Sequence, residues 1–315
     1  MPRALVTGAA GFVGSHLCEA LRARGDEVIG VDCFTAYYGR VQKEANAEAV
    51  RAAGVKLVDA DLRTTDVRSL LDGIDVVYHQ AGQPGVRLSW SDGFDEYVQQ
   101  NVVVTQRLLE AAYHLRTSRF VYASSSSVYG NQPRYPTRET DLPAPHSPYG
   151  VTKLAAEHLC ALYAANWAVP AVSLRYFTVY GPRQRPDMAI HRLCEAVLGR
   201  AAFTQYGNGR QVREFTFVTD IVAGNIAAAT ADVAPGTCVN LSGGAEIELR
   251  DLISLVGEIA GSEVAVEVRD AMPGDSLRNG GSIDRARALL GWEPTVGLRD
   301  GIISQLAWHR ERSAR

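Results

Sequence analysis

The sequence predicts an α/β protein: a doubly wound parallel sheet covered by helices, with a smaller lobe formed by the C-terminal half. Short apolar runs typical of buried strands alternate with amphipathic helical stretches through the first half of the chain. A glycine-rich turn joins the first of these strands to the first helix. Such alternation gives parallel strands with helices on both faces of the sheet. Apolar residues make up 46% of the 315 residues, which is enough for a sizeable core.

The predicted elements follow one another in strand–helix order. The strands are short and apolar, at residues 3–6, 27–31, 56–58, 75–79, 120–123 and 172–176. The helices carry an apolar face, at residues 15–24, 65–71, 101–114 and 149–167. After about residue 170 the alternation loosens and glycine clusters appear. We therefore expect one domain over residues 1–170 and, over 171–315, a lobe that partly returns to the sheet, with no linker between them.

The turn after the first strand has the pattern of a dinucleotide-binding loop. Its glycines permit a tight turn and a close backbone approach to a pyrophosphate, which the helix N-terminus then attracts. The residues concerned are Gly8, Gly11, Phe12, Val13 and Gly14. Asp32 ends the second strand, where an acid accepts hydrogen bonds from an adenosine ribose and repels a 2′-phosphate. The first domain is therefore expected to be of the Rossmann type and to bind NAD rather than NADP, although Asp32 alone would also suit a solvated strand end.

Later strand ends supply further candidate contacts to this cofactor. Asp61 and Leu62 follow the third strand, where an adenine edge could be held. The small residues Ala81 and Gly82 follow the fourth strand and would let the cofactor pass. Asn101 is expected at the start of a helix, where it either contacts the cofactor or only caps the helix.

Tyr149 and Lys153 are the candidate catalytic pair. Ser147 and Pro148 suit the N-cap and first position of a helix, so residues four apart beyond them share one face. A tyrosine of pKa ~10 is a poor base at neutral pH, but a nearby ammonium and a positive nicotinamide stabilise its phenolate. A serine cluster at residues 124–127 follows the fifth strand, at the edge where doubly wound sheets bind ligands. Alone, such a cluster would equally suit a loop whose serine side chains hydrogen-bond to the loop's own backbone.

Together these residues resemble the extended short-chain dehydrogenase/reductase family of sugar-nucleotide epimerases and dehydratases, over nearly the whole chain. The resemblance includes the stretches 175–182, 213–220 and 273–275. It implies a catalytic serine at Ser125, three residues before Val-Tyr-Gly, and a homodimer formed by helices 101–114 and 149–167. It also implies nucleotide contacts from Arg213, on the diphosphate, and from the segment that contains Tyr206, against the base.

The serines before Val-Tyr-Gly narrow the reaction. Dehydratases of the family carry an Asp-Glu pair there and uronate decarboxylases a Glu, whereas this chain has Ser126 and Ser127. Without an acid for elimination, epimerisation at C4 of a UDP-sugar is favoured. The stretches 83–87 and 178–189 resemble the corresponding stretches of UDP-glucuronate 4-epimerases. The candidate substrate-binding residues within them are Arg87, Thr178 and Arg185, and Asp275 in the stretch 273–275 is a further candidate.

The chain departs from the pattern of these epimerases at two positions, and several alternative functions remain open. Gln184 stands where these epimerases have glycine, and Pro84 where they have alanine. The main alternative is a UDP-glucose/UDP-galactose 4-epimerase, followed by a dehydratase or decarboxylase with relocated acids. A non-catalytic NAD-binding regulator is also open, although such proteins commonly lack the Tyr/Lys pair.

Composition excludes other classes of protein. The net charge of -3 gives no electrostatic reason for a nucleic acid or membrane partner, and no run approaches the ~18 apolar residues of a membrane span. The five cysteines are scattered without metal-ligand spacing, so neither a disulfide framework nor a metal site is expected. Reduced thiols and the absence of a signal peptide indicate a cytoplasmic protein.

Overall fold

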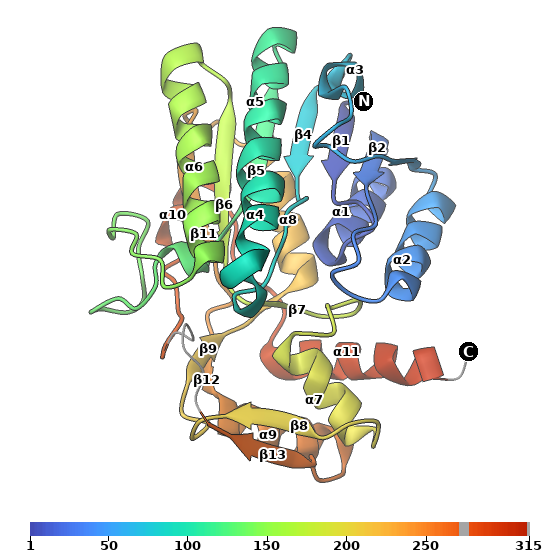
Figure 1. Cartoon of the computed structure of the whole chain (residues 1–315), viewed down its shortest axis with the longest axis vertical. Coiled ribbons are helices and arrows are strands. Elements are labelled where there is room, and N and C mark those ends of the chain that lie inside the picture. The colour runs from blue at the N-terminus through green and yellow to red at the C-terminus, as the bar shows by residue number, and fades with distance from the viewer. Residues whose placement is uncertain (271–276, 314–315) are drawn as a thin grey trace.

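A computed structural model describes residues 1–270 and 277–313 and confirms the predicted doubly wound α/β fold (Figure 1). Seven parallel strands form the central sheet in the order β11-β6-β5-β4-β1-β2-β3. Chain order reverses between β1 and β4, which places a ligand-binding crevice at the carboxyl ends of these strands. The strands are β1 (Arg3–Thr7), β2 (Glu27–Asp32), β3 (Lys56–Asp59), β4 (Val76–His79), β5 (Arg119–Ser125), β6 (Ala171–Tyr176) and β11 (Thr237–Leu241).

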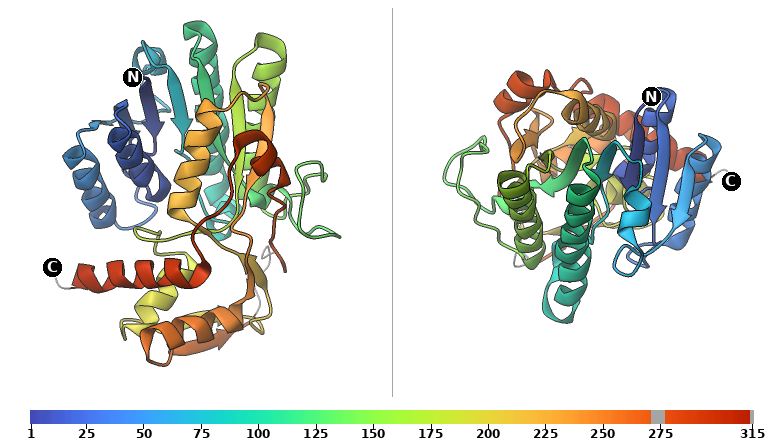
Figure 2. Two further views of the ribbon diagram at one scale, coloured as in Figure 1. Left: turned by 180° about the vertical axis from the view of Figure 1, so that it is seen from behind. Right: turned by 90° about the horizontal axis from the view of Figure 1, so that it is seen from above.

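Helices cover both faces of the sheet (Figure 2). One face carries α1 (Phe12–Ala23), α2 (Arg40–Ala52) and α8 (Val218–Thr230), with α10 (Asp284–Leu290) at its edge. The other face carries α3 (Val67–Leu71), α5 (Val104–Leu115) and α6 (Pro148–Trp167).

The two core layers follow from the period of two along each strand. In β1, Leu5 packs among α3, α5 and α6, while its neighbours Ala4 and Val6 pack among α1 and α8. In β5, Phe120 and Val121 divide between the two layers in the same way. All five side chains are at most 1% exposed, so both faces of the sheet are buried.

A smaller lobe lies below the carboxyl ends of the strands (Figure 1). Its core joins three helices through Leu193, Leu252 and Ile302. These helices are α7 (Ala189–Val197), α9 (Leu249–Ala260) and α11 (Leu298–Ser313). Short strand pairs complete the lobe: β8 (Phe203–Tyr206) with β13 (Val266–Arg269), β9 (Val212–Glu214) with β12 (Glu246–Glu248), and β7 (Val179–Tyr180) with β10 (Thr216–Phe217). Strand β11 and helix α8, both beyond residue 170, belong to the sheet layers, and the division at that residue stays a prediction.

One helix boundary differs from its prediction. The helix expected to begin at Asn101 begins instead at α4 (Phe94–Tyr97) and runs through a π-helical segment (Val98–Val103) into α5. Asn101 therefore lies inside a continuous helix and caps nothing. Phe94, Tyr97 and Val98 have the i, i+3, i+4 spacing of a helix, and burial of Tyr97, which is 1% exposed, extends the helix beyond its predicted start.

His79 at the end of β4 is a buried neutral histidine whose proton position follows from its partners. The Thr105 hydroxyl donates to the Asn101 carbonyl oxygen at 2.6 Å, so at 2.9 Å it must accept from His79 Nε2. His79 Nδ1 then accepts from the Thr7 hydroxyl at 2.8 Å, and that oxygen accepts from the Ala81 backbone N–H at 3.0 Å. Burial, with a smaller contribution from Lys153, lowers the pKa of His79 from 6.5 to about 3.

We expect this histidine to make the fold less stable in mild acid. Between its ordinary pKa near 6.5 and the folded value of about 3, the unfolded chain binds a proton that the folded chain does not. The free energy of unfolding should therefore fall as pH falls below 6.5, by about 1.4 kcal/mol per pH unit from this group. Urea unfolding at several pH values should give a flatter dependence for His79→Gln, and equal slopes would contradict the assignment.

Candidate active site

The crevice at the switch point opens into a cavity of about 800 Å³. Its walls come from the glycine-rich turn, from the ends of β2, β4, β5 and β6, and from the lobe. Among the residues that line it are Gly8, Gly11, Phe12, Val13, Gly14, Asp32, Leu62, Ala81, Gly82, Arg87, Ser125, Ser126, Ser127, Tyr149, Lys153, Thr178, Arg185, Tyr206 and Arg213. Nearly all residues predicted from the sequence therefore meet in one place.

The glycine-rich turn forms a cradle that side chains would fill. Gly8 has a φ of +70°, and a Cβ there would lie 2.9 Å from the Ala81 backbone nitrogen. A Cβ on Gly14 would collide with the Gly8 carbonyl oxygen. Helix α1 begins after Gly11 without a side-chain cap, so its first N–H groups remain available to a phosphate. These features fit a bound dinucleotide.

Asp32 is held at the end of β2 by backbone donors. Its two carboxylate oxygens accept from the N–H groups of Ala10 at 3.0 Å and Phe34 at 2.8 Å. The ammonium of Lys43, itself 6% exposed, lies 3.8 Å from one of these oxygens. Asp32 thus faces the cavity as a fixed acceptor, as a ribose hydroxyl requires.

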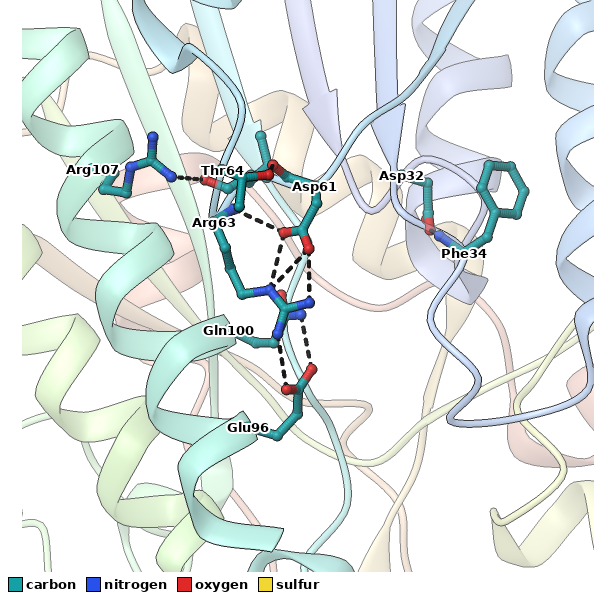
Figure 3. Close-up of polar contacts among 9 residues, drawn as sticks. Asp32, Phe34, Asp61, Arg63, Thr64, Glu96, Gln100 and Arg107 are labelled. Carbon is teal, nitrogen blue, oxygen red and sulfur yellow. Dashed lines mark hydrogen bonds and ion pairs between the residues drawn. The ribbon is translucent and has the colours of Figure 1, made fainter.

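Asp61 does not line the cavity, although its neighbour Leu62 does. Figure 3 shows its carboxylate turned toward Arg63, with which it forms contacts of 2.7 and 2.9 Å. Arg63 also reaches Glu96 at 3.0 Å, so this carboxylate belongs to an ion-pair network beside the crevice. The arginine hydrogen bond is the main reason that the pKa of Asp61 lies below its ordinary value.

Asn101 also lies behind the cavity wall and is 1% exposed. Its Oδ1 accepts from the backbone N–H of Gln83 at 2.7 Å, and its Nδ2 donates to the Gln83 carbonyl oxygen at 3.0 Å. The same Nδ2 donates to the Thr152 hydroxyl at 3.0 Å, on the helix that carries Tyr149. Asn101 therefore joins the loop after β4 to helix α6.

Tyr149 lies in the first turn of α6 and lines the cavity together with Ser125. Ser147 caps the helix as expected, accepting from the Gly150 N–H at 3.1 Å. Burial raises the pKa of Tyr149, whereas its hydrogen bond with Ser125 and the charge of Arg185 lower it. Burial is the largest of these effects, so the pKa of Tyr149 lies above its ordinary value.

Lys153 lies one turn further along α6 and is 7% exposed. Its ammonium lies 4.8 Å from the centroid of the Tyr122 ring, which attracts a cation. Burial lowers the pKa of Lys153 to about 8.

The serine cluster contacts a residue that the sequence did not indicate. The Ser125 hydroxyl accepts from the Ser127 N–H at 3.1 Å, which fixes the turn. The Ser126 hydroxyl accepts from Asn279 Nδ2 at 3.0 Å, and Asn279 Oδ1 is buried without a hydrogen-bond partner among the described residues. Asn279 lies far along the chain among glycines, where no motif marked it.

Arg185 lines the cavity but is already paired. Its Nε and one terminal nitrogen donate to the two carboxylate oxygens of Asp187 at 3.0 and 2.9 Å. Tyr37, from the loop after β2, donates to Asp187 at 3.3 Å. Burial raises the pKa of Asp187, but Arg185 outweighs it and the pKa lies below its ordinary value.

The lobe wall brings together Arg87 and Tyr206, which were predicted from separate stretches. The Arg87 guanidinium lies 4.1 Å from the centroid of the Tyr206 ring, in a cation–π contact. Arg213 lines the same wall and donates to the Val212 carbonyl oxygen at 2.9 Å. Asp275 lies outside the described residues.

A group of metal-ligating side chains occurs outside the cavity. Atoms of His191, Glu195 and His309 lie within 4.8 Å of one another, between α7 and α11. The Glu195 carboxylate already accepts from His309 Nδ1 at 2.6 Å and from Arg200 at 2.6 Å. The arginine supplies the positive charge that a metal ion would bring, so the group acts as an interhelical brace.

Comparisons with known proteins agree with this geometry. The NAD dependent epimerase/dehydratase family model matches residues 4–242. A Bacillus subtilis (strain 168) protein described as an uncharacterized UDP-glucose epimerase, YtcB, is 40% identical over 308 residues and covers 96% of each chain. A probable UDP-glucuronate 4-epimerase of Rhizobium meliloti (strain 1021) is 32% identical, over 99% of this chain and 98% of that protein. The crystal structure of UDP-glucuronic acid 4-epimerase from Bacillus cereus, in complex with UDP-glucuronic acid and NAD, is similar with a TM-score of 0.95 and 41% identity, over 98% and 99% of the two chains.

Proposed function

This chain belongs to the NAD dependent epimerase/dehydratase family, and from that premise we propose that it is an NAD-dependent 4-epimerase that converts UDP-glucuronate to UDP-galacturonate. The observation that carries the proposal is that Tyr149 and Ser125 line the same cavity as the glycine-rich turn, where Ser125 acts on the pKa of the Tyr149 hydroxyl. A base beside a dinucleotide cradle suits removal of a proton and a hydride from one sugar carbon.

The chain's own residues account for the proton transfers. Tyr149 takes the proton of the sugar 4-hydroxyl, which Ser125 orients through its hydroxyl. The glycine-rich turn and Asp32 would hold NAD, which would supply the hydride acceptor for C4 and the hydride donor for its opposite face. Lys153 keeps a positive charge near the nicotinamide ribose, and a cation there favours loss of the Tyr149 proton. Once the 4-keto sugar has turned its other face toward the nicotinamide, Tyr149 returns the proton to the C4 oxygen, which completes the inversion at C4.

The residues beside Ser125 explain why epimerisation is favoured over carbon–oxygen or carbon–carbon cleavage. Oxidation of a uronate at C4 gives a β-keto acid, which loses carbon dioxide readily. Ser126, Ser127 and Thr178 offer hydroxyls rather than an acid, so they can hold a carboxylate without supplying a proton to an eliminated group. Arg213, Arg87 and Tyr206 are proposed to hold the UDP moiety.

A UDP-glucose 4-epimerase is the second candidate, because the Bacillus subtilis relative carries that description. The two activities share the Tyr149 chemistry and differ only at C6 of the sugar. Purified enzyme should therefore be given UDP-glucuronate and UDP-glucose separately, with product identification and measurement of carbon dioxide. A kcat/KM at least about tenfold higher for UDP-glucuronate, with no carbon dioxide, is the expected result. Preference for UDP-glucose would replace the proposal with its rival, and stoichiometric carbon dioxide would indicate a decarboxylase.

The proposed assembly is a homodimer that pairs α5 and α6 of two subunits. Leu108 and Leu109 on α5 are 0% exposed in the monomer core, so they cannot contribute to the apolar face of this dimer. Leu162 and Trp167 are 52% and 48% exposed on α6, and Tyr113 on α5 is 40% exposed. These three side chains supply an apolar surface that a second copy would cover.

Sedimentation equilibrium at micromolar concentration should show a dimer. Leu162→Glu should shift the protein toward monomer, because a charge cannot be buried at the contact without a partner. Val41→Glu is the matched control, because Val41 is 74% exposed on α2, and it should leave the dimer intact. A wild-type protein that is monomeric throughout would remove this interface.

We also propose a cytoplasmic location. The five cysteines are all free, and burial raises the pKa of Cys18 and Cys160, which keeps their thiols protonated. No helix among the described residues is long and apolar enough to cross a membrane.

A further inference from the structure

The turn that presents Arg185 to the cavity adopts a backbone conformation that side chains seldom favour. Gly181 has a φ of +137° and Arg183 a φ of +66°, and the latter is in the left-handed region without being glycine. Such a turn persists only when contacts outside it determine its shape. Arg185 follows directly, so whatever fixes this turn also fixes where its guanidinium lies.

Gln184 lies at the centre of those contacts. Its side chain is 0% exposed, and its Nε2 donates to the Val179 carbonyl oxygen at 2.8 Å. Its Oε1 accepts two hydrogen bonds, from the His191 backbone N–H at 2.9 Å and from Gln305 Nε2 at 2.8 Å. One side chain therefore ties the turn to strand β7, helix α7 and helix α11.

The backbone around Gln184 is braced by α7 and α11 and, in addition, by α2. Its carbonyl oxygen accepts from His191 Nδ1 at 2.8 Å and from Gln42 Nε2, on α2, at 3.1 Å. Gln305 Oε1 accepts from the Gly181 N–H at 2.8 Å, so the two glutamine side chains bridge the start and the end of the turn. Gln305 is also 0% exposed, and neither glutamine lines the cavity.

We propose that Gln184, held by Gln305 of the C-terminal helix, is a positioning residue that sets the Arg185 guanidinium against the sugar. This inference rests on the proposed function. Removing the Gln184 side chain leaves three buried polar groups without their partner, and such groups rearrange or recruit water. The turn then loosens, and the placement of Arg185 loosens with it. A misplacement of about 1 Å at a site can lower a rate by as much as about a hundredfold.

A double-mutant cycle separates this role from a general structural one. Kinetic constants for UDP-glucuronate and UDP-glucose are measured for wild type, Gln184→Met, Arg185→Ala and the double variant. Gln184→Met should raise KM for UDP-glucuronate about tenfold more than KM for UDP-glucose, while in the Arg185→Ala background it should change neither KM by more than about twofold. Equal fold-changes in both backgrounds would overturn the proposal, because Gln184 would then act independently of Arg185.

Gln305→Met tests the same link from outside the turn and serves if Gln184→Met does not fold. It should reproduce the rise in KM for UDP-glucuronate, and an unchanged ratio of the two KM values would overturn the role given to α11. Asn240→Leu is the matched control, since Asn240 is a 0% exposed amide whose partners include Tyr129 and Thr137. It should lower thermal stability without changing the ratio. A wild type that does not use UDP-glucuronate refutes the proposed function instead, and the cycle is then read on the sugar that it does use.

Discussion

A Tyr149→Phe enzyme is expected to turn over about a thousandfold more slowly than wild type while it still retains NAD. The substitution removes one hydroxyl, and general acid–base groups contribute about 10²–10⁴-fold to rates. The ring itself stays in place, because it packs edge-on against Tyr97 with centroids 6.1 Å apart and begins a capped helix. Among the atoms that line the cavity only the Tyr149 hydroxyl is removed, so the retention of NAD should not change.

Two measurements check this result. NAD released by denaturation reports retention, and a coupled assay on the preferred sugar reports turnover. Tyr163→Phe, on the same helix, removes a hydroxyl that contacts Glu110 at 2.7 Å and does not line the cavity. It should keep wild-type turnover. Tyr149→Phe with undiminished turnover would mean that another group accepts the proton.

The sheet and its helices were predictable wherever apolar residues carry the period. Leu5 and its neighbours alternate between two buried layers, and this pattern is visible in the sequence. Helix α2 was missed because its inward face is polar: Gln42, Lys43 and Asn46 are 5%, 6% and 3% exposed. These side chains bind loop carbonyl oxygens and Asp32 instead of packing in the core, so no apolar period indicates the helix.

The cavity walls were predictable where a motif fixes the backbone, as at the glycine-rich turn and at Tyr149 and Lys153. Asp61 shows the limit, since its position after β3 was right but Arg63, two residues on, holds its carboxylate. Asn279 and Gln184 show a second limit of prediction from the sequence. Asn279 reaches Ser126 from 153 residues away and Gln184 meets Gln305 from 121 residues away, and the tertiary fold alone creates such pairs.

Arg185→Ala is expected to lower kcat/KM for UDP-glucuronate by about a hundredfold and for UDP-glucose by no more than a few-fold. Loss of a hydrogen-bonded charge partner costs about 2–5 kcal/mol, and a hundredfold loss corresponds to about 2.7 kcal/mol. The structure refines how the contact is made. Asp187 occupies the Nε edge of the guanidinium through two hydrogen bonds, so a substrate carboxylate would meet the remaining terminal nitrogen or displace Asp187.

Asp187 must also be considered in the interpretation of this variant. Arg185→Ala leaves a carboxylate without its cation beside the cavity, and that charge alone would repel a uronate. The double variant Arg185→Ala/Asp187→Asn removes both charges, so the loss that persists in it belongs to the missing arginine contact. Arg185→Lys keeps the charge without the planar fork and should lie between wild type and Arg185→Ala. Equal losses on both sugars in the double variant would show that Arg185 supports the cavity as a whole and does not discriminate a carboxylate from a hydroxymethyl group at C6.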